Sequence, residues 1–401
     1  MPITPNSAST TKRQQGILLL GLIAIAFNLR PSLAAVGPLT STLREGLGLS
    51  NALLGFLTTL PLIAFGVFST LTPLFTRRLG IRGTLGLALL LLTFGSAIRA
   101  IDSISTLYVG TLFIGIAIAF GNVLIPSLVK QNFTKNSGAI TSVYSGVMGI
   151  GAAVAAGLSV PLSKQADIGW QGALGIWSIP AGIALVLWIP QLIRPKIKPL
   201  KRNYLQAMKH LGSSKLAWKI ALFMGFQSMA FYIILAWLPD MIESRGFNSV
   251  YAGWMLSLSQ ITGVLGSLII PFWAGKKTDQ RTIIWVLILI EFCSIIGLLL
   301  PQLGGVPLWV ALIGFALGGS FGLCLLLIVM RSSDAETATE LSGMSQSIGY
   351  LIAATGPYIF GQIFDLSQRW STALYFLLAI VVIKLYVGLG AAKPGKLSYD
   401  A

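Results

Sequence analysis

The sequence predicts an all-α membrane protein whose twelve transmembrane helices form two related six-helix bundles. The prediction comes from the composition, the recurrence of long apolar runs and one polar stretch near the middle of the chain. Of the 401 residues, 55% are apolar and only 10% are charged, whereas a typical soluble domain carries about 25% charged residues. So few charges cannot cover a soluble protein of this size, which excludes soluble enzymes, secreted disulfide scaffolds and disordered chains.

Apolar runs of about 20 residues, the length that crosses ~30 Å of hydrocarbon as a helix, recur along the whole chain. Their continuity excludes a membrane β-barrel, whose ~10-residue strands alternate polar and apolar side chains. The first run is too long for a cleaved signal peptide and contains Arg30. The twelve predicted spans cover residues 17–38, 51–75, 83–101, 106–128, 138–161, 169–190, 217–239, 251–272, 282–301, 306–329, 341–363 and 371–391.

Most basic residues fall on one side of these spans. Of the 28 Lys and Arg residues, 21 lie in segments on the side of the two termini and 5 lie in the opposite loops. By the positive-inside rule, we expect a multi-pass protein of the cytoplasmic (inner) membrane with both termini in the cytoplasm. The net charge of +16 is then a topology signal reinforced by attraction to anionic lipid headgroups. The bilayer is therefore an expected partner, and nucleic acid is not.

The longest polar stretch divides the chain after the sixth span. We expect an N-terminal six-helix bundle over residues 1–190, a basic cytoplasmic linker over 191–216 and a C-terminal six-helix bundle over 217–401. Four apolar residues recur at helical spacing within the linker, which is typical of an amphipathic helix on a membrane surface. These four are Tyr204, Leu205, Met208 and Leu211.

The two halves also match each other weakly in sequence. An offset of 198 residues places Pro73 on Pro271, and Gly121-Asn122 on Gly319-Ser320. Duplicated halves of this kind place a substrate site near the middle of the bilayer, between the repeats.

With these features the chain resembles the major facilitator superfamily over essentially its full length. The loop that contains Arg77, Arg78 and Arg82 is a degraded form of the superfamily's Gly-x-x-x-Asp-Arg-x-Gly-Arg-Arg signature, without the usual Asp. Four further segments are similar to the cyanate and 2-nitroimidazole transporter family. They are Asn28-Leu29-Arg30-Pro31, Gly121-Asn122-Val123-Leu124-Ile125-Pro126, Gln227-Ser228 with Phe231-Tyr232, and Trp237-Leu238-Pro239.

This resemblance implies the major facilitator fold, with the loop of Arg77, Arg78 and Arg82 as a gating loop. It implies a secondary active transporter that moves a small anionic, nitro-aromatic or cyanate-like solute by alternating access. Proton-coupled efflux of neutral drug-like compounds is the alternative, although the antiporter signature of span five is not reproduced. A membrane-embedded enzyme would need a nucleophile with a base, or clustered metal ligands. The spans contain no histidine, so we expect no enzyme and no catalytic residue.

Three charged residues lie well inside the predicted spans rather than at their ends: Arg30, Glu291 and Lys384. A charge in mid-membrane costs about 2.5–3.5 kcal/mol or more, so such residues usually have a function. Pro31 frees the Phe27 carbonyl and predicts a kink beside Arg30. A guanidinium stays charged when desolvated and binds a planar or linear anion at two points. Arg30 is therefore the main candidate for substrate binding, and a structural bond to backbone carbonyls is the alternative.

By analogy with the superfamily, spans one, four, seven and ten line the central cavity, and spans two, five, eight and eleven form the moving interface. Neutral polar and aromatic side chains on these helices complete the predicted substrate site. Each of them could equally bond one helix to another, but their grouping favours a site. They are Asn28, Asn122, Tyr144, Gln227, Ser228, Tyr232, Trp237, Gln260, Ser320 and Gln346.

Glu291 is the candidate for proton coupling, although we favour a structural role in which it pairs with Lys384 or caps backbone groups. Lys384 lies near the inner end of span twelve, and we expect it to extend to the membrane surface. Cys293 and Cys324 both lie in spans, which indicates neither a disulfide nor a metal site. We expect a monomer with no cofactor and no metal, a small-molecule substrate, and a proton as a candidate coupling ion.

Overall fold

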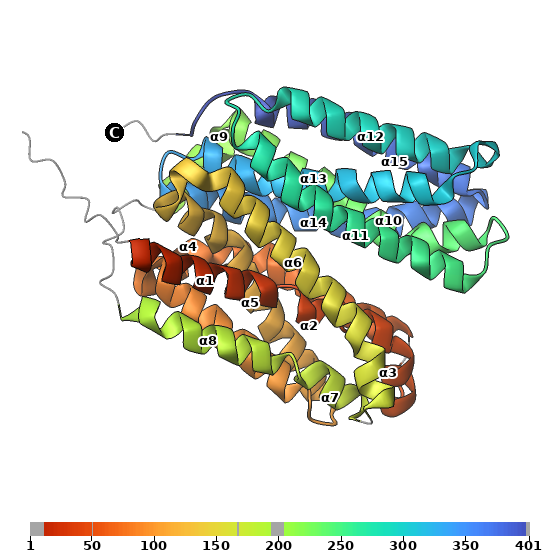
Figure 1. Ribbon diagram of the computed structural model, residues 1–401, viewed down its shortest axis with the longest axis horizontal. Helices are drawn as coiled ribbons and strands as arrows, with labels where there is room; N and C mark the ends of the chain where they lie inside the picture. Colours follow the sequence, from red (N-terminus) through yellow and green to blue (C-terminus); the bar gives the residue numbers. More distant parts are fainter. Residues whose placement is uncertain (1–11, 50, 167, 194–203, 398–401) are drawn as a thin grey trace, which may run out of the picture.

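The computed structural model describes residues 12–49, 51–166, 168–193 and 204–397, and in these residues the chain is helical with no strand. The helices lie in two groups side by side, which we call the first bundle and the second bundle (Figure 1). The first bundle comprises α1 (Lys12–Asn28), α2 (Pro31–Ala34), α3 (Thr40–Leu47), α4 (Asn51–Ile98), α5 (Ile104–Asn132), α6 (Ser137–Val160), α7 (Gly169–Gly175) and α8 (Ser178–Leu192). The second comprises α10 (Lys215–Glu243), α11 (Ser249–Ala274), α12 (Arg281–Leu299), α13 (Val306–Arg331), α14 (Ala335–Ser367) and α15 (Trp370–Ala392).

Short helical turns join or extend several of these helices. They are η1 (Gly37–Leu39), η2 (Thr134–Asn136), η3 (Pro161–Gln165) and η4 (Pro301–Leu303). A separate helix, α9 (Tyr204–Ser213), precedes the second bundle and contacts α10 and α14. It forms where the amphipathic linker helix is predicted, and its Leu211 is fully buried. Residues 194–203 of the predicted linker lie outside the described residues.

These helices account for the twelve predicted spans. Ten stretches of the described chain are long and apolar enough to cross a membrane. One of them, Thr59–Ile98 in α4, contains two predicted spans, because Gly80 interrupts the helix with φ 75°, a conformation that glycine adopts without strain. The remaining span is α14, which contains many Ser, Thr and Gly residues and the acidic residues Glu336, Glu340 and Asp365.

Two of the helix pairs along which the bundles meet are α6 with α11 and α4 with α14. Glycines allow the close approach at both: a Cβ added to Gly138 would lie 2.7 Å from Gly275 Cα, and one added to Gly66 would lie 3.2 Å from Leu351. Hydrogen bonds also cross the interface, since Ser145 donates to the carbonyl of Ser267 at 2.9 Å. In the predicted numbering these pairs are spans five with eight and two with eleven, the helices expected at the moving interface.

The contacts between bundles concentrate at one end of the molecule. We call it the terminal end, because α1 begins and α15 ends there, and the opposite end the far end (Figure 1). Along α6, close packing on α11 runs from Gly138 at the terminal end to Gly149, where an added Cβ would lie 2.6 Å from Val264. Further toward the far end, Gly157 of α6 and Gly253 of α11 have no such neighbour within 4 Å. The bundles are therefore tightly packed at the terminal end and separated at the far end.

Candidate functional site

Arg30 lies at an interruption of the first membrane-spanning stretch. α1 ends at Asn28 and α2 begins at Pro31, so Arg30 occupies the N-cap position with φ −121°. The interruption follows from Pro31, which has no N–H to donate to the Phe27 carbonyl. That carbonyl is covered by α6 at Gly151, where the space has no room for a Cβ. The predicted kink beside Arg30 is therefore present.

A second arginine holds the chain just after this interruption. Arg99, at the end of α4, donates from Nη1 to the carbonyl of Ser32 at 2.7 Å. The hydroxyls of Ser32 and Ser96 are 3.0 Å apart and also hydrogen-bonded. Arg99 lies near the end of the predicted span 83–101, and its side chain is fully buried. A guanidinium keeps its charge when it is desolvated, so Arg99 keeps its charged hydrogen bond to the Ser32 carbonyl.

The Arg30 guanidinium faces the second bundle. Its Cζ lies 5.2 Å from the centroid of the Phe321 ring in α13, a distance at which a cation is attracted to a ring face. It also lies within hydrogen-bonding reach of the Tyr232 hydroxyl in α10. Arg30 is partly exposed, and among the described residues no carboxylate forms an ion pair with it. Its positive charge is therefore open to an anionic ligand between the bundles.

Tyr350 of α14 links Arg30 to α5, the helix of predicted span four. It lies within electrostatic range of Arg30 and of Tyr232, and its hydroxyl accepts a hydrogen bond from Asn122 Nδ2 in α5 at 3.3 Å. The ring of Phe65 in α4 packs on it with 4.8 Å between centroids. Arg30, Asn122, Tyr232, Phe321 and Tyr350 thus form one group that draws on both bundles, and we call it the Arg30 site.

Three other candidates are buried inside the protein. Tyr144 is 1% exposed, with its hydroxyl beside Thr141, and Ser320 and Gln346 are both 0% exposed. The Ser320 hydroxyl and both polar atoms of the Gln346 amide have no hydrogen-bond partner among the described residues. Buried polar groups are normally satisfied by protein, water or ligand, so these positions have bonding capacity to offer a bound molecule.

The remaining candidates form hydrogen bonds within one bundle. Asn28 donates to the carbonyls of Ala24 at 2.9 Å and Pro180 at 3.1 Å, which ties α1 to α8. Gln227 donates to Ser228 Oγ at 2.6 Å. Trp237 and Gln260 also form their hydrogen bonds within the second bundle. Trp237 Nε1 donates to the Pro357 carbonyl at 2.9 Å, and Gln260 Nε2 donates to Ser259 Oγ at 3.2 Å. The structure does not place these side chains against Arg30.

The two ionisable residues of the second bundle form a buried ion pair. Lys384 Nζ of α15 donates to Glu291 Oε2 of α12 at 2.6 Å, and both side chains are 0% exposed. The expectation that Lys384 extends to the membrane surface is therefore wrong, because a carboxylate inside the bundle neutralises its charge. The pairing is the structural role favoured for Glu291, and its role in proton coupling stays a prediction.

The predicted gating loop lies at the interruption of α4. Arg77 and Arg78 are exposed and Arg82 is partly exposed, on either side of Gly80. The backbone carbonyl of Arg82 accepts a hydrogen bond from Trp188 Nε1 in α8 at 2.9 Å, which fixes the start of the second half of α4. A role of this loop in gating stays a prediction.

Sequence reasoning missed Tyr350 and Phe321, the two aromatic residues that complete the Arg30 site. It included the aromatic residues Tyr144, Tyr232 and Trp237, but a further aromatic residue in an apolar span has little to mark it. Two signals were nevertheless available: Tyr350 lies one helical turn after Gln346, and Phe321 directly follows Ser320. Within the described residues, no group of three or more His, Cys, Asp or Glu is placed to hold a metal ion.

The chain matches a known protein family and is similar to several known transporters. The family model described as Major Facilitator Superfamily matches residues 18–357. An uncharacterized transporter of Bacillus subtilis (strain 168) is 40% identical, with 95% of each chain covered. A 2-nitroimidazole transporter of Escherichia coli (strain K12) is 36% identical, with 96% of this chain and 98% of the relative covered. A cyanate transport protein of the same organism is 26% identical, with 88% of this chain and 91% of the relative covered.

The fold also matches a solved structure. The transporter FucP, crystallised in its outward conformation, superimposes with a TM-score of 0.75 over 92% of this chain and 97% of its own. The sequences are only 11% identical in this comparison, so the match concerns the arrangement of helices alone.

Proposed function

The chain belongs to the Major Facilitator Superfamily, and on that premise we propose that it moves a small anionic, nitro-aromatic or cyanate-like solute across the cytoplasmic membrane by alternating access. Membership confirms the resemblance found in the sequence, the twelve-helix fold and the multi-pass membrane topology. Proteins of this superfamily are transporters and not enzymes, which confirms that expectation as well. A transporter takes a small-molecule substrate, and its identity is part of the proposal.

The observation that supports the proposal most directly is the environment of the Arg30 guanidinium. It lies at a helix interruption between the bundles, partly exposed, with aromatic rings beside it and no carboxylate paired with it among the described residues. A planar cation with aromatic neighbours suits a flat or linear anion, which it can bind at two points. The names of two relatives, the 2-nitroimidazole transporter and the cyanate transport protein, support small compounds of this kind.

The spacing of the bundles supports alternating access. Glycine and serine contacts close the terminal end, whereas helices α6 and α11 separate beyond Gly149 and Val264. The bias of basic residues leads us to place the terminal end in the cytoplasm, so that this conformation faces outward. The gating loop of Arg77, Arg78 and Arg82 lies at the closed end in this arrangement. When the bundles rock, the Arg30 site would open to the other side.

The test is transport by Arg30→Ala in proteoliposomes. A thermal-shift screen of purified protein with cyanate, nitro-heterocycles and small carboxylates selects the solute, and counterflow of the labelled solute then measures transport. We expect Arg30→Ala to lose transport while its unfolding temperature stays within about 2 °C of the wild type, because a partly exposed side chain with no ion pair contributes little to stability.

The matched control is Arg369→Ala, which removes the same charge from an exposed residue at the start of α15. This variant should transport at the wild-type rate. Counterflow by Arg30→Ala at the wild-type rate would overturn the proposal, and so would an equal loss in both variants.

A further inference from the structure

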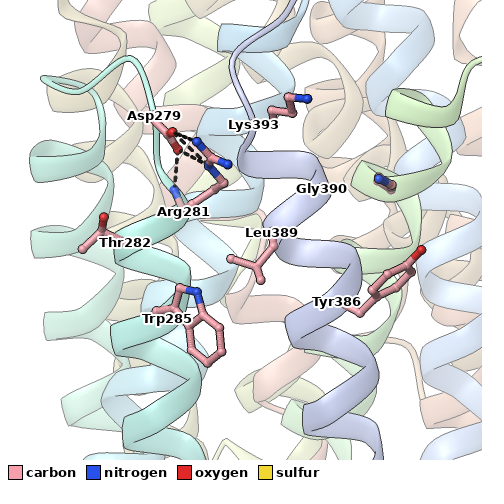
Figure 2. A pocket seen from close by; sticks show the side chains of 9 residues that line it. Asp279, Arg281, Thr282, Trp285, Tyr386, Leu389, Gly390 and Lys393 are labelled. Atoms are coloured by element: carbon pink, nitrogen blue, oxygen red, sulfur yellow. Dashed lines mark hydrogen bonds and ion pairs between the residues drawn. The ribbon is translucent and has the colours of Figure 1, made fainter.

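A cavity of about 610 Å³ opens at the terminal end of the second bundle, away from the Arg30 site. It lies where the start of α10, the start of α12 and the end of α15 come together, and Figure 2 shows the side chains that line it. The lining residues are Lys219, Asp279, Arg281, Thr282, Trp285, Tyr386, Leu389, Gly390 and Lys393. Neither the predicted transport site nor the similarity to known transporters assigns a role to this cavity.

The lining of the cavity is positively charged. Lys219, Arg281 and Lys393 carry three positive charges against the single negative charge of Asp279. The carboxylate of Asp279 accepts from Arg281 at 2.6 Å and 2.9 Å, and these hydrogen bonds hold the pKa of Asp279 below its ordinary value. Asp279 therefore stays ionised and orients Arg281, and the two lysines are left in excess.

The geometry of the cavity depends on a glycine. A Cβ added to Gly390 of α15 would lie 2.6 Å from Lys219 Nζ, so a larger residue would displace the lysine from its place. The same ammonium lies 6.0 Å from the centroid of the Tyr386 ring, over its face. A smaller adjoining cavity of about 220 Å³ shares Lys219, Gly390 and Lys393 and adds Lys215. The cationic surface thus continues along the start of α10.

Aromatic and aliphatic side chains border the cavity on the side away from the terminal end. The Trp285 side chain is 54% exposed and that of Tyr386 is 73% exposed, and aromatic residues of this kind concentrate where a membrane meets water. Further along the same two helices, Leu289 is 61% and Val382 is 58% exposed. An apolar track on α12 and α15 therefore leads from the cations toward the middle of the membrane.

We propose that this cavity binds the phosphate of an anionic membrane phospholipid, with the acyl chains along the apolar track of α12 and α15. Lys219 and Lys393 contact the phosphate, and Trp285 and Tyr386 flank the glycerol region. A free phosphate would use the cations alone. The exposed aromatic and aliphatic side chains beside them favour a ligand that is anionic at one end and apolar at the other.

Native mass spectrometry of the detergent-purified full-length protein tests the proposal directly. Phosphatidylglycerol or phosphatidylcholine is titrated in, and the bound fraction is measured for the wild type and for the double variant Lys219→Ala/Lys393→Ala. We expect phosphatidylglycerol to bind preferentially to the wild type and its affinity to fall roughly 10-fold or more in the double variant, because each lysine near an anionic headgroup contributes substantially to attraction.

The matched control is Lys276→Ala/Lys277→Ala, which removes two exposed lysines at the same end of the molecule but outside the cavity. It should keep the wild-type affinity. If both double variants lose the lipid equally, the attraction is unspecific and the proposal fails. If the cavity variant does not fold, Lys393→Ala alone, at an exposed position, gives the same comparison with a smaller expected loss.

Inorganic phosphate and glycerol phosphate distinguish a lipid from a soluble anion. We expect neither to displace bound phosphatidylglycerol at millimolar concentration, since neither occupies the apolar track. Displacement at that concentration, or equal binding of phosphatidylcholine and phosphatidylglycerol, would overturn the proposal. None of these measurements depends on transport, so the outcome is independent of the function assigned to the Arg30 site.

Discussion

Arg30 in the first bundle and Lys384 in the second are both cations inside membrane-spanning helices, but their surroundings differ. Lys384 is fully buried and bonded to Glu291 at 2.6 Å. Arg30 lies at a helix interruption, partly exposed, and contacts aromatic residues of the other bundle. One cation has its counter-charge within the protein, and the other is placed where a solute can supply it.

The two residues show two ways in which a charge can be stabilised inside the membrane. Removing a charge from water is expensive in the membrane interior, and an ion pair with good geometry offsets the cost permanently. Such a pair fastens α12 to α15 and has no charge left for a ligand. A cation that has no carboxylate partner within the protein can still attract an anionic substrate. The partner of each charge thus separates the structural role of Lys384 from the substrate-binding role that we propose for Arg30.

The largest expected effect comes from breaking the buried pair. In Glu291→Ala, Lys384 keeps its charge without a partner, and we expect a loss of about 3–5 kcal/mol in the free energy of unfolding. Thermal or denaturant unfolding of the purified protein measures it. The double variant Glu291→Leu/Lys384→Met replaces the pair with apolar side chains and should recover most of that stability.

Transport by this double variant sharpens the comparison. If the pair is structural, Glu291→Leu/Lys384→Met should retain proton-dependent and proton-independent uptake alike. A variant that is stable but has lost only its dependence on the proton gradient would instead establish Glu291 as the coupling residue.

A smaller effect is expected from Arg30→Lys, which keeps the charge but loses the planar fork. Loss of one hydrogen bond to a charged group costs about 1.5 kcal/mol, so we expect the solute to bind about 10-fold more weakly. Titration of the purified protein with the solute found in the thermal-shift screen measures the affinity. Unchanged affinity would indicate that charge alone, without two-point recognition, holds the solute.

The smallest effect is expected from Tyr350→Phe. This change removes the hydroxyl that accepts from Asn122 and leaves the ring that packs on Phe65. A neutral hydrogen bond contributes about 0.5–1.5 kcal/mol, so solute affinity should fall about threefold. Tyr358→Phe, at a 70% exposed position on the same helix, is the control and should bind as the wild type. Equal affinity in both variants would remove Tyr350 from the site.

Features of the site that depend on a single residue could be predicted from the sequence. A charge at the centre of a span is conspicuous, so Arg30 could be identified from the sequence, and Pro31 beside it predicted the helix interruption. Pairings between distant helices could not be derived in the same way. Asn28 and Asn122 are the same residue type on predicted cavity helices, yet one bonds to Pro180 within its bundle and the other to Tyr350 across the interface.

The helical membrane fold, the division into two halves and the family follow from the sequence alone, because hydrophobic length, charge bias and short motifs are properties of contiguous residues. Which polar groups meet depends instead on how the helices pack against one another. Lys384 is long enough to reach the membrane surface, and it pairs with Glu291 because α12 and α15 bring the carboxylate within 2.6 Å. The cavity of Lys219, Arg281 and Lys393 likewise draws on three helices far apart in the chain. Burial and partnership depend on distances between helices, which no local pattern specifies.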